Sequence, residues 1–331
     1  MHIRDRKALK QFANARLSEA TYDPRLLMLI HTGVSLSVTL LISVLSFILE
    51  QQIGSTGGLS GIGLRSVLTT AQSALQLASM VMLPFWEIGM VYAAMRLARR
   101  QSAFPGDLTA GFRRFGPVLR LMLLRAAVSF GIISACANVA ATVFMITPLS
   151  APTVAVLQPL WDAAASSGLA GIELSEATLA ALIPTLLPVI PIFLGLLLIA
   201  LVPILYRLRL ADYVIMEEEK TGALFALIIS WRLTRHQVIS LFRLDLSFWW
   251  FYALQAAAVL LAYCNDLLLL LGVTLPISAA AADFLFYGIY ALAMLALFWR
   301  FGSYYHTTFA TAYNALRQEA PEQFFQKRTQ Y

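Results

Sequence analysis

Charged residues are scarce in this chain of 331 residues. Asp, Glu, Lys and Arg make up 13% of it and hydrophobic residues 59%, whereas roughly a quarter of an ordinary soluble domain is charged. A soluble fold of this size would lack the charges to cover its surface, and no long stretch is polar enough to form a separate soluble domain. The composition therefore predicts an integral membrane protein.

Cysteine and histidine are also rare. The two cysteines, Cys136 and Cys264, both lie in apolar stretches, where a small buried side chain is the usual role. Their number excludes a disulfide framework, and the four histidines form no motif with metal-ligand spacing. No Ser-His-Asp order with local signatures and no facing pair of intramembrane carboxylates appears. We therefore expect no enzymatic activity, no metal and no cofactor.

Six long apolar runs account for most of the chain. About 20 apolar residues suffice for a helix to cross roughly 30 Å of hydrocarbon, so the runs predict an all-α polytopic bundle of about six transmembrane helices within residues 25–312. The first run lies behind a charged segment and continues too far to be a cleavable signal. We expect the spans at residues 26–49, 67–95, 119–147, 179–206, 244–265 and 282–303.

The cations lie almost entirely on one side of this arrangement. Of the 24 Lys and Arg residues, 23 lie before the first run, after the last run, in the second and fourth connections, or at the ends of the runs that adjoin these segments, and only Arg65 lies on the other side. The positive-inside rule then predicts a cell-membrane protein with both termini in the cytoplasm, and residues 313–331 as a cytoplasmic tail. The net charge of +6 follows from this topology and does not indicate nucleic acid binding.

Residues 1–24 are predicted to form a basic amphipathic helix in the cytoplasm. Apolar residues recur at helical spacing on one side and cations occupy the other. Such a helix binds the anionic inner leaflet, and a solvated leader is the alternative. The apolar residues are Leu9, Phe12, Ala13 and Leu17, and the cations are Arg4, Lys7, Lys10 and Arg16.

Glu87 is the least expected residue of the second run. It lies nine residues before Arg96, about 13 Å into the span at 1.5 Å per residue. An ionisable side chain at that depth is costly, and it indicates either a pair that joins two helices or a proton or substrate site. We expect Glu87 to pair with Arg125 of the third run, with His31 or with Arg300.

The fourth run is crowded with prolines. Each proline removes a backbone hydrogen bond and favours a kink. Two interpretations stay open, a kinked packing helix and a helix broken at a substrate site, as in some transporters. The prolines are Pro184, Pro188, Pro191 and Pro203.

The stretch after the fourth run carries the most specific pattern of the chain. Tyr213-Val-Ile-Met216 is followed by Glu217-Glu-Glu219, Ala226-Leu-Ile-Ile-Ser-Trp-Arg-Leu-Thr-Arg235 and Leu241-Phe-Arg-Leu-Asp-Leu-Ser-Phe248. This pattern resembles a bacterial family of integral membrane proteins of unknown function, which looks related to the membrane domain fused to some glycerophosphodiester phosphodiesterases. Residues 304–316 are similar to the Tyr-rich helix that closes the family's pattern. The resemblance implies a membrane fold and no particular activity.

Ser230, Arg235 and Asp245 are the candidate polar residues of this pattern. Asp245 lies at the start of the fifth run, within reach of a cation such as Arg209, Arg232 or Arg235. Ser230 has the hydroxyl to bond a helix carbonyl. Together they would hold an amphipathic helix at residues 221–234 against the bundle. Binding of a ligand or partner is the alternative.

Three functions remain open. The first is a non-enzymatic membrane protein that serves envelope maintenance, assembly or binding of a membrane partner. The second is a small transporter or export factor for an amphiphilic solute, using Glu87 and the fourth span. The third is an anchor or regulator of a separate enzyme. The expected partners are membrane lipids, above all the anionic inner leaflet, with a protein partner or a homo-oligomer left open.

Overall fold

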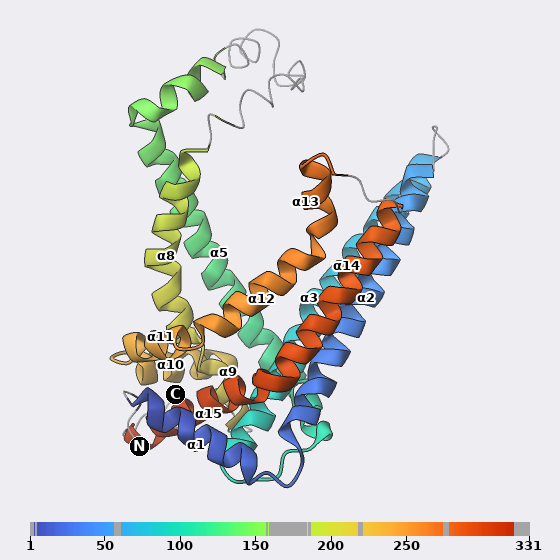
Figure 1. Ribbon diagram of the computed structural model, residues 1–331. Helices are drawn as coiled ribbons and strands as arrows, with labels where there is room; N and C mark the ends of the chain where they lie inside the picture. Colours follow the sequence, from blue (N-terminus) through green and yellow to red (C-terminus); the bar gives the residue numbers. More distant parts are fainter. Residues whose placement is uncertain are drawn as a thin grey trace. The chain divides into compact units, whose positions relative to one another are not determined.

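The computed structural model describes most of the chain. The described residues are 3, 5–55, 61–156, 158, 184, 187–217, 221–273 and 278–320. Every regular element among them is a helix. Five helices are long and apolar enough to cross a membrane, or six if one bent pair counts as a single span. The predicted all-α multi-pass membrane fold is thus confirmed (Figure 1).

The chain divides into two compact units. Unit 1 comprises Met1–Met122 and Arg209–Tyr331, and unit 2 comprises Leu123–Leu208. Unit 1 therefore joins the first third of the sequence to the last third. Each unit is described by itself below.

The long helices of unit 1 overlap the predicted apolar runs. α2 (Pro24–Ser55) packs against α3 (Gly61–Ala98) and α14 (Ala279–Leu297), and α12 (Trp249–Ala262) packs against α14. Asp23 caps the start of α2, because its carboxylate accepts the backbone N–H of Arg25 at 2.9 Å, and Pro24 suits the first helical position.

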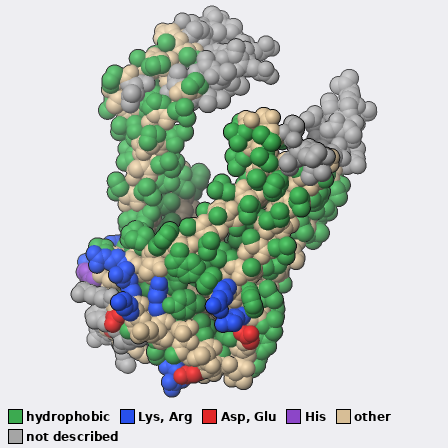
Figure 2. Space-filling view, viewed as in Figure 1, with side chains coloured by type: hydrophobic (Ala, Val, Ile, Leu, Met, Phe, Trp, Pro, Cys, Tyr) green, Lys and Arg blue, Asp and Glu red, His purple; other side chains and the backbone are tan. Residues whose placement is uncertain are grey.

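The outer faces of these long helices are apolar and exposed. Leu41 of α2 is 60% exposed and Leu292 of α14 is 68% exposed. Figure 2 shows hydrophobic side chains over α12 and α14, while Lys and Arg side chains gather at the lower end of the view, where Figure 1 labels α1 and α11. Exposed apolar surface of this extent is what lipid covers in a membrane protein.

The buried core of unit 1 lies at the end of the spans and surrounds α15 (Ser303–Glu319). α15 packs against α1, α2 and α3, and most of its residues from Ser303 to Leu316 are buried. The boundary predicted between residues 312 and 313 therefore falls inside a buried helix. We call the short helices here, together with α15, the α15 layer. They are α1 (Arg6–Ser18), η1 (Pro105–Thr109), α4 (Ala110–Arg113) and α9 (Ala211–Glu217).

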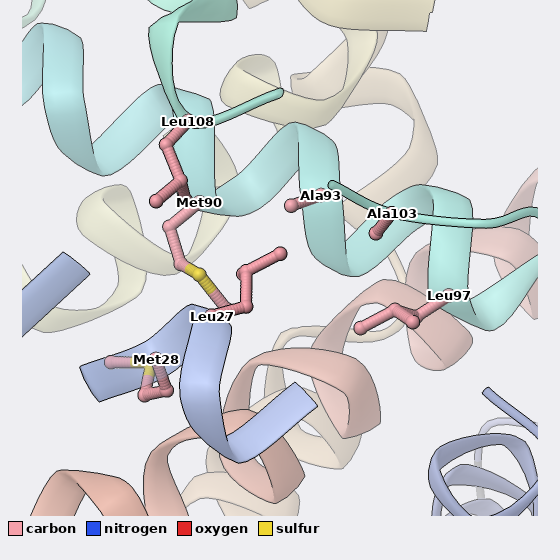
Figure 3. Packing of buried hydrophobic residues seen from close by; sticks show 7 residues of the cluster. All are labelled: Leu27, Met28, Met90, Ala93, Leu97, Ala103 and Leu108. Carbon is pink, nitrogen blue, oxygen red and sulfur yellow. The ribbon is translucent and has the colours of Figure 1, made fainter. Parts of the chain in front are cut away.

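α3 packs very closely on the layer at two glycines. A Cβ atom at Gly89 would lie 1.8 Å from the carbonyl oxygen of Leu108, and one at Gly111 would lie 2.0 Å from that of Phe85. Only glycine permits this approach of two backbones. The apolar cluster beside it joins α2, α3 and η1 (Figure 3) and contains Leu27, Met28, Met90, Ala93, Leu97, Ala103 and Leu108.

The fifth span, predicted at residues 244–265, is bent near its start. α11 (Val238–Leu246) and α12 meet at an angle of 59°. No proline causes this bend. α10 (Ala223–Thr234) precedes it and packs on α9, and α13 (Cys264–Leu270) follows α12. The sixth span is interrupted by a π-helical turn, η4 (Phe298–Gly302), before α15.

Unit 2 contains most of α5 (Phe115–Met145), the short η2 (Pro148–Ser150) and α8 (Val189–Leu208). α8 runs through Pro203 without interruption, and Pro191 lies in its first turn, where proline is well tolerated. From Val189 onward the fourth span is therefore a continuous helix, and Pro188 lies in the turn before it. Residues 179–183, at the start of the predicted run, lie outside the described residues.

Candidate functional site

Asp245 lies at the centre of a polar network that spans three elements of unit 1. Its carboxylate accepts a hydrogen bond from Arg209 at 2.7 Å, from Tyr252 of α12, and from Tyr305 of α15 at 3.4 Å. Arg209 also donates to the hydroxyl of Tyr305, and its guanidinium lies 3.8 Å from the ring centre of Phe309. Of the three cations that the sequence offered to Asp245, the structure places Arg209 beside it.

The motif around Asp245 forms the bend of the fifth span. Ser247 donates its hydroxyl to the carbonyl of Leu244 at 2.5 Å, which closes the last turn of α11. The next residue, Phe248, is buried against the rings of Tyr304 and Tyr305. The bend is thus held by a hydroxyl that satisfies the helix end and by an aromatic side chain that enters the α15 layer.

α1 contributes two cations to the same helix end. Arg6 donates to the carbonyl of Arg243 at 3.4 Å, and Lys10 donates to that of Ser247 at 3.0 Å. Cations near the C-terminus of a helix are favourable because the carbonyls there carry partial negative charge. Burial, and secondarily the charge of Arg6, lower the pKa of Lys10 below its usual value of 10.5.

The apolar face of α1 does not point outward. Leu9 and Ala13 are completely buried, and α1 packs on α15 and α3. The predicted helix exists, from Arg6 to Ser18. Leu9 and Ala13 of its apolar stripe cover protein, Phe12 and Leu17 are partly exposed, and binding of α1 to the leaflet stays a prediction. An apolar stripe in the sequence is compatible with contact to lipid and with contact to protein, because both surfaces exclude water.

Ser230 lies on α10, and Arg235 is the residue that follows this helix. Ser230 is completely buried, and its carbonyl accepts the hydroxyl of Thr234 at 2.8 Å. Arg235 follows the last residue of α10 and is exposed. The carboxylate of Asp245 contacts α12 and α15, and α10 packs on α9.

A second polar network joins α9, α3 and the end of α15. Glu217 receives hydrogen bonds from Arg99 at 2.7 Å and from Tyr313, and the Nε atom of Arg317 lies 3.6 Å from it. Arg99 also donates to the side chain of Asn314 at 3.0 Å. The two networks fix α15 near its start and near its end.

Glu87 lies beside two buried histidines. One carboxylate oxygen is 3.4 Å from Nε2 of His31 on α2, and the other is 3.9 Å from Nε2 of His306 on α15. The side chain of Glu87 is 52% exposed, while those of the two histidines are 7% and 9% exposed. His31 was one of the three predicted partners, and His306 was not foreseen.

Arg125, the first-named partner for Glu87, belongs to unit 2. Its guanidinium donates to the carbonyl of Leu208, the last residue of α8, at 3.1 Å. This contact again places a cation at the C-terminus of a helix. Arg125 thus ties α5 to the end of α8.

These arrangements have the chemistry of structural attachments. Asp245 and Glu217 each accept hydrogen bonds from a cation and a phenol on different helices, which is the pattern of a side chain that joins helices. Glu87 differs, because half of its side chain is exposed. Among the described residues, no three His, Cys, Asp or Glu side chains come together in a way that could hold a metal ion.

Sequence reasoning missed the phenols that complete the networks. Tyr252, Tyr305 and Tyr313 are supplied by helices far apart in sequence, and tyrosine is ordinary in an apolar run. The signal that was present is the resemblance of residues 304–316 to a Tyr-rich helix, which we had left without a structural role.

The sequence model of one family, described as a protein of unknown function (DUF975), matches residues 1–320. No curated protein and no solved structure matches the chain. The match covers nearly the whole chain, including residues 213–248, and the relation to the membrane domain fused to some glycerophosphodiester phosphodiesterases stays a prediction. The expected family of unknown function is thereby confirmed.

Proposed function

The chain belongs to the DUF975 family, and we propose that it is a non-enzymatic protein of the bacterial cell membrane. Its role is to support envelope maintenance or assembly by holding a rigid helical platform in the cytoplasmic leaflet. The platform consists of the α15 layer and of α10 and α11, which are attached to it.

The outward faces of α10 and α11 carry this proposal. α10 and α11 each bury one side against the rest of unit 1. On the other side, each exposes apolar residues at helical spacing. Arginines lie beside both stripes, a combination that favours the interface of an anionic leaflet. The exposed apolar residues are Leu224, Ile228 and Trp231 on α10, and Ile239, Phe242 and Leu246 on α11.

The layer would hold these two helices at a fixed height. α11 is followed by the bend at Ser247 and then by α12, which is a segment of the fifth span. Because of this bend, the axis of α11 turns away from the axis of α12 at the start of the span. The Asp245 network and the packing of α10 on α9 fix both helices to α15 and α3. Because 23 of the 24 cations lie on this side of the predicted topology, the platform faces the cytoplasm in this proposal.

A spin label at residue 224 tests the leaflet contact. With Cys136 and Cys264 replaced, Leu224→Cys should be accessible to oxygen and protected from a soluble nickel chelate in vesicles that contain phosphatidylglycerol. Asn14→Cys is the matched control, because it is exposed on α1 and should show the reverse. Equal access of the nickel chelate to both labels would refute the leaflet contact.

The resemblance at residues 213–248 adds a related proposal. If this family is related to the membrane domain fused to some glycerophosphodiester phosphodiesterases, the platform would anchor or regulate a separate enzyme. A protein partner or a second copy of the chain would then dock on the same layer. Crosslinking from position 14 in intact cells, followed by mass spectrometry, would reveal such a partner.

Transport of an amphiphilic solute is the second candidate, and Glu87 favours it. A carboxylate that is half exposed within a membrane span, with buried histidines at 3.4 and 3.9 Å, has the composition of a proton or solute site. We expect a structural role instead, because His31 and His306 join α2 and α15 to α3 through this contact.

The two functions predict opposite effects of Glu87→Gln. A structural Glu87 tolerates Gln, because the amide still offers a donor and an acceptor, whereas a proton site does not. The measurement is growth of a deletion strain in sodium dodecyl sulfate, complemented with parent, Glu87→Gln or Glu87→Leu. If the Glu87→Gln protein is folded but does not restore growth in sodium dodecyl sulfate, transport becomes the favoured function.

A further inference from the structure

A cavity of about 800 Å³ lies in unit 1 where three spans end. Its walls come from the last turns of α3, from α4, from the first turn of α5 and from the end of α9. The candidate spans at Ser66–Ala98, Phe115–Met145 and Val189–Glu217 end or begin at these residues. The cavity is therefore at the depth of lipid headgroups, and its volume suits a small ligand.

Positive charge dominates this cavity. Arg96, Arg99, Arg113 and Arg114 line it, with Glu217 as the one carboxylate among its lining residues. Arg99 pairs with Glu217, and Arg96 pairs with the buried Asp107 at 2.8 Å. These pairs fix two guanidinium groups in place and leave the lining with an excess of cations.

Arg113 is the cation best placed to meet a ligand. It is exposed, and its Nη2 atom donates to the neutral carbonyl of Gly106 at 3.1 Å. Within the described part of the chain, Arg113 forms no ion pair. A guanidinium with a single main-chain partner keeps several donors for the oxygens of a phosphate, which it can bind in a bidentate way.

The start of α5 adds to this attraction. Phe115 and Gly116 are the first two residues of this 31-residue helix, and both line the cavity. The N-terminus of a helix carries partial positive charge and presents backbone N–H groups to an anion. The helix end and the arginines therefore favour the same kind of ligand.

Most of the other side chains that line the cavity are apolar, with Gln101 as a polar exception, and this points to an amphiphile. Tyr92, Met95, Phe115, Pro117 and Met216 line the cavity together with the arginines. A soluble anion would bury no apolar surface against them, whereas a lipid places glycerol and the first acyl carbons there.

We propose that this cavity binds the phosphate group of an anionic phospholipid, with Arg113 as a direct contact. Arg96, Arg99 and the N-terminus of α5 complete the anion site, and the apolar walls contact the glycerol and upper acyl chains. This site does not depend on which leaflet the platform occupies, so it holds independently of the proposed function.

Native mass spectrometry of the full-length protein tests the proposal. Parent, Arg113→Gln and Arg120→Gln are titrated with phosphatidylglycerol and with a diacylglycerol of the same acyl chains. Arg120 is the matched control, because it is an exposed arginine nearby that does not line the cavity. Arg113→Gln should weaken phosphatidylglycerol binding about tenfold, as expected for loss of a charged hydrogen-bond donor, and Arg120→Gln should not.

Three results would overturn the proposal. Equal binding of phosphatidylglycerol and diacylglycerol by the parent would show that the protein does not recognise the phosphate group. Equal weakening by Arg113→Gln and Arg120→Gln would show general surface charge instead of a site. Release of the lipid by millimolar inorganic phosphate, with phosphate binding lost in Arg113→Gln, would assign the site to a soluble phosphate. Retention of the lipid in that competition supports the assignment to a phospholipid.

Discussion

Replacing Asp245 by Ala should destabilise unit 1 markedly. The change removes the acceptor of Arg209 and of two tyrosine hydroxyls, and the side chains of Arg209 and Asp245 are only 25% and 13% exposed. Breaking a buried pair costs about 3–5 kcal/mol and a hydrogen bond to a charged group about 1.5–3 kcal/mol. Because this pair retains some solvent contact, we expect about 3 kcal/mol.

Thermal unfolding in detergent measures this loss. At about 2–4 °C per kcal/mol for a unit of this size, the Asp245→Ala midpoint should fall by about 6–12 °C. Asp245→Asn keeps the shape and one acceptor, so its midpoint should fall about half as far. Asp266→Ala is the control, because Asp266 is exposed on α13. Equal midpoints for the two Ala variants would refute the structural role of Asp245.

Two further predictions concern the packing of the layer. Gly89→Ala should lower the midpoint by several degrees, because its Cβ would lie 1.8 Å from a backbone oxygen of Leu108, while Gly131→Ala has open space and should be neutral. Lys10→Met tests the contact of α1 by pH. Since the pKa of Lys10 is lowered on folding, the unfolded chain binds more protons and the parent should gain stability relative to Lys10→Met as the pH rises toward 10.5. A constant difference in midpoint across that range would contradict this.

The membrane-spanning helices were predictable because their signal is local. A run of about 20 apolar residues is sufficient evidence for a span. The bend at Ser247 was not predictable in this way. It arises without proline. The Ser247 hydroxyl donates to the carbonyl of Leu244 within the run, and Phe248 is buried against Tyr304 and Tyr305 of α15, which lie outside the run.

The α15 layer was the largest feature that sequence reasoning missed. α15 is rich in Thr, Tyr and Ala and has no long apolar run, so its burial has no local signal. Tertiary packing decides such a case. The same reason explains His306, whose place beside Glu87 is set by the packing of α15 on α3.

The candidate residues were found more easily than their partners. Asp245 and Glu87 stood out because carboxylates are rare in apolar runs. Their partners come from helices distant in sequence, Arg209 and Tyr305 for Asp245 and His31 for Glu87. A single sequence shows which residue types could pair with Asp245 and Glu87. It does not contain the distances that decide which of these residues is the partner.

The orientation of the layer is the central claim of the proposed function, and side-specific labelling tests it directly. In a protein with Cys136 and Cys264 replaced, one cysteine is introduced at Gly106, which is exposed in the layer, or at Gly57, in the predicted outer connection. A membrane-impermeant maleimide should label Gly57→Cys in intact cells and Gly106→Cys only after lysis. Labelling of Gly106→Cys in intact cells would contradict a cytoplasmic platform.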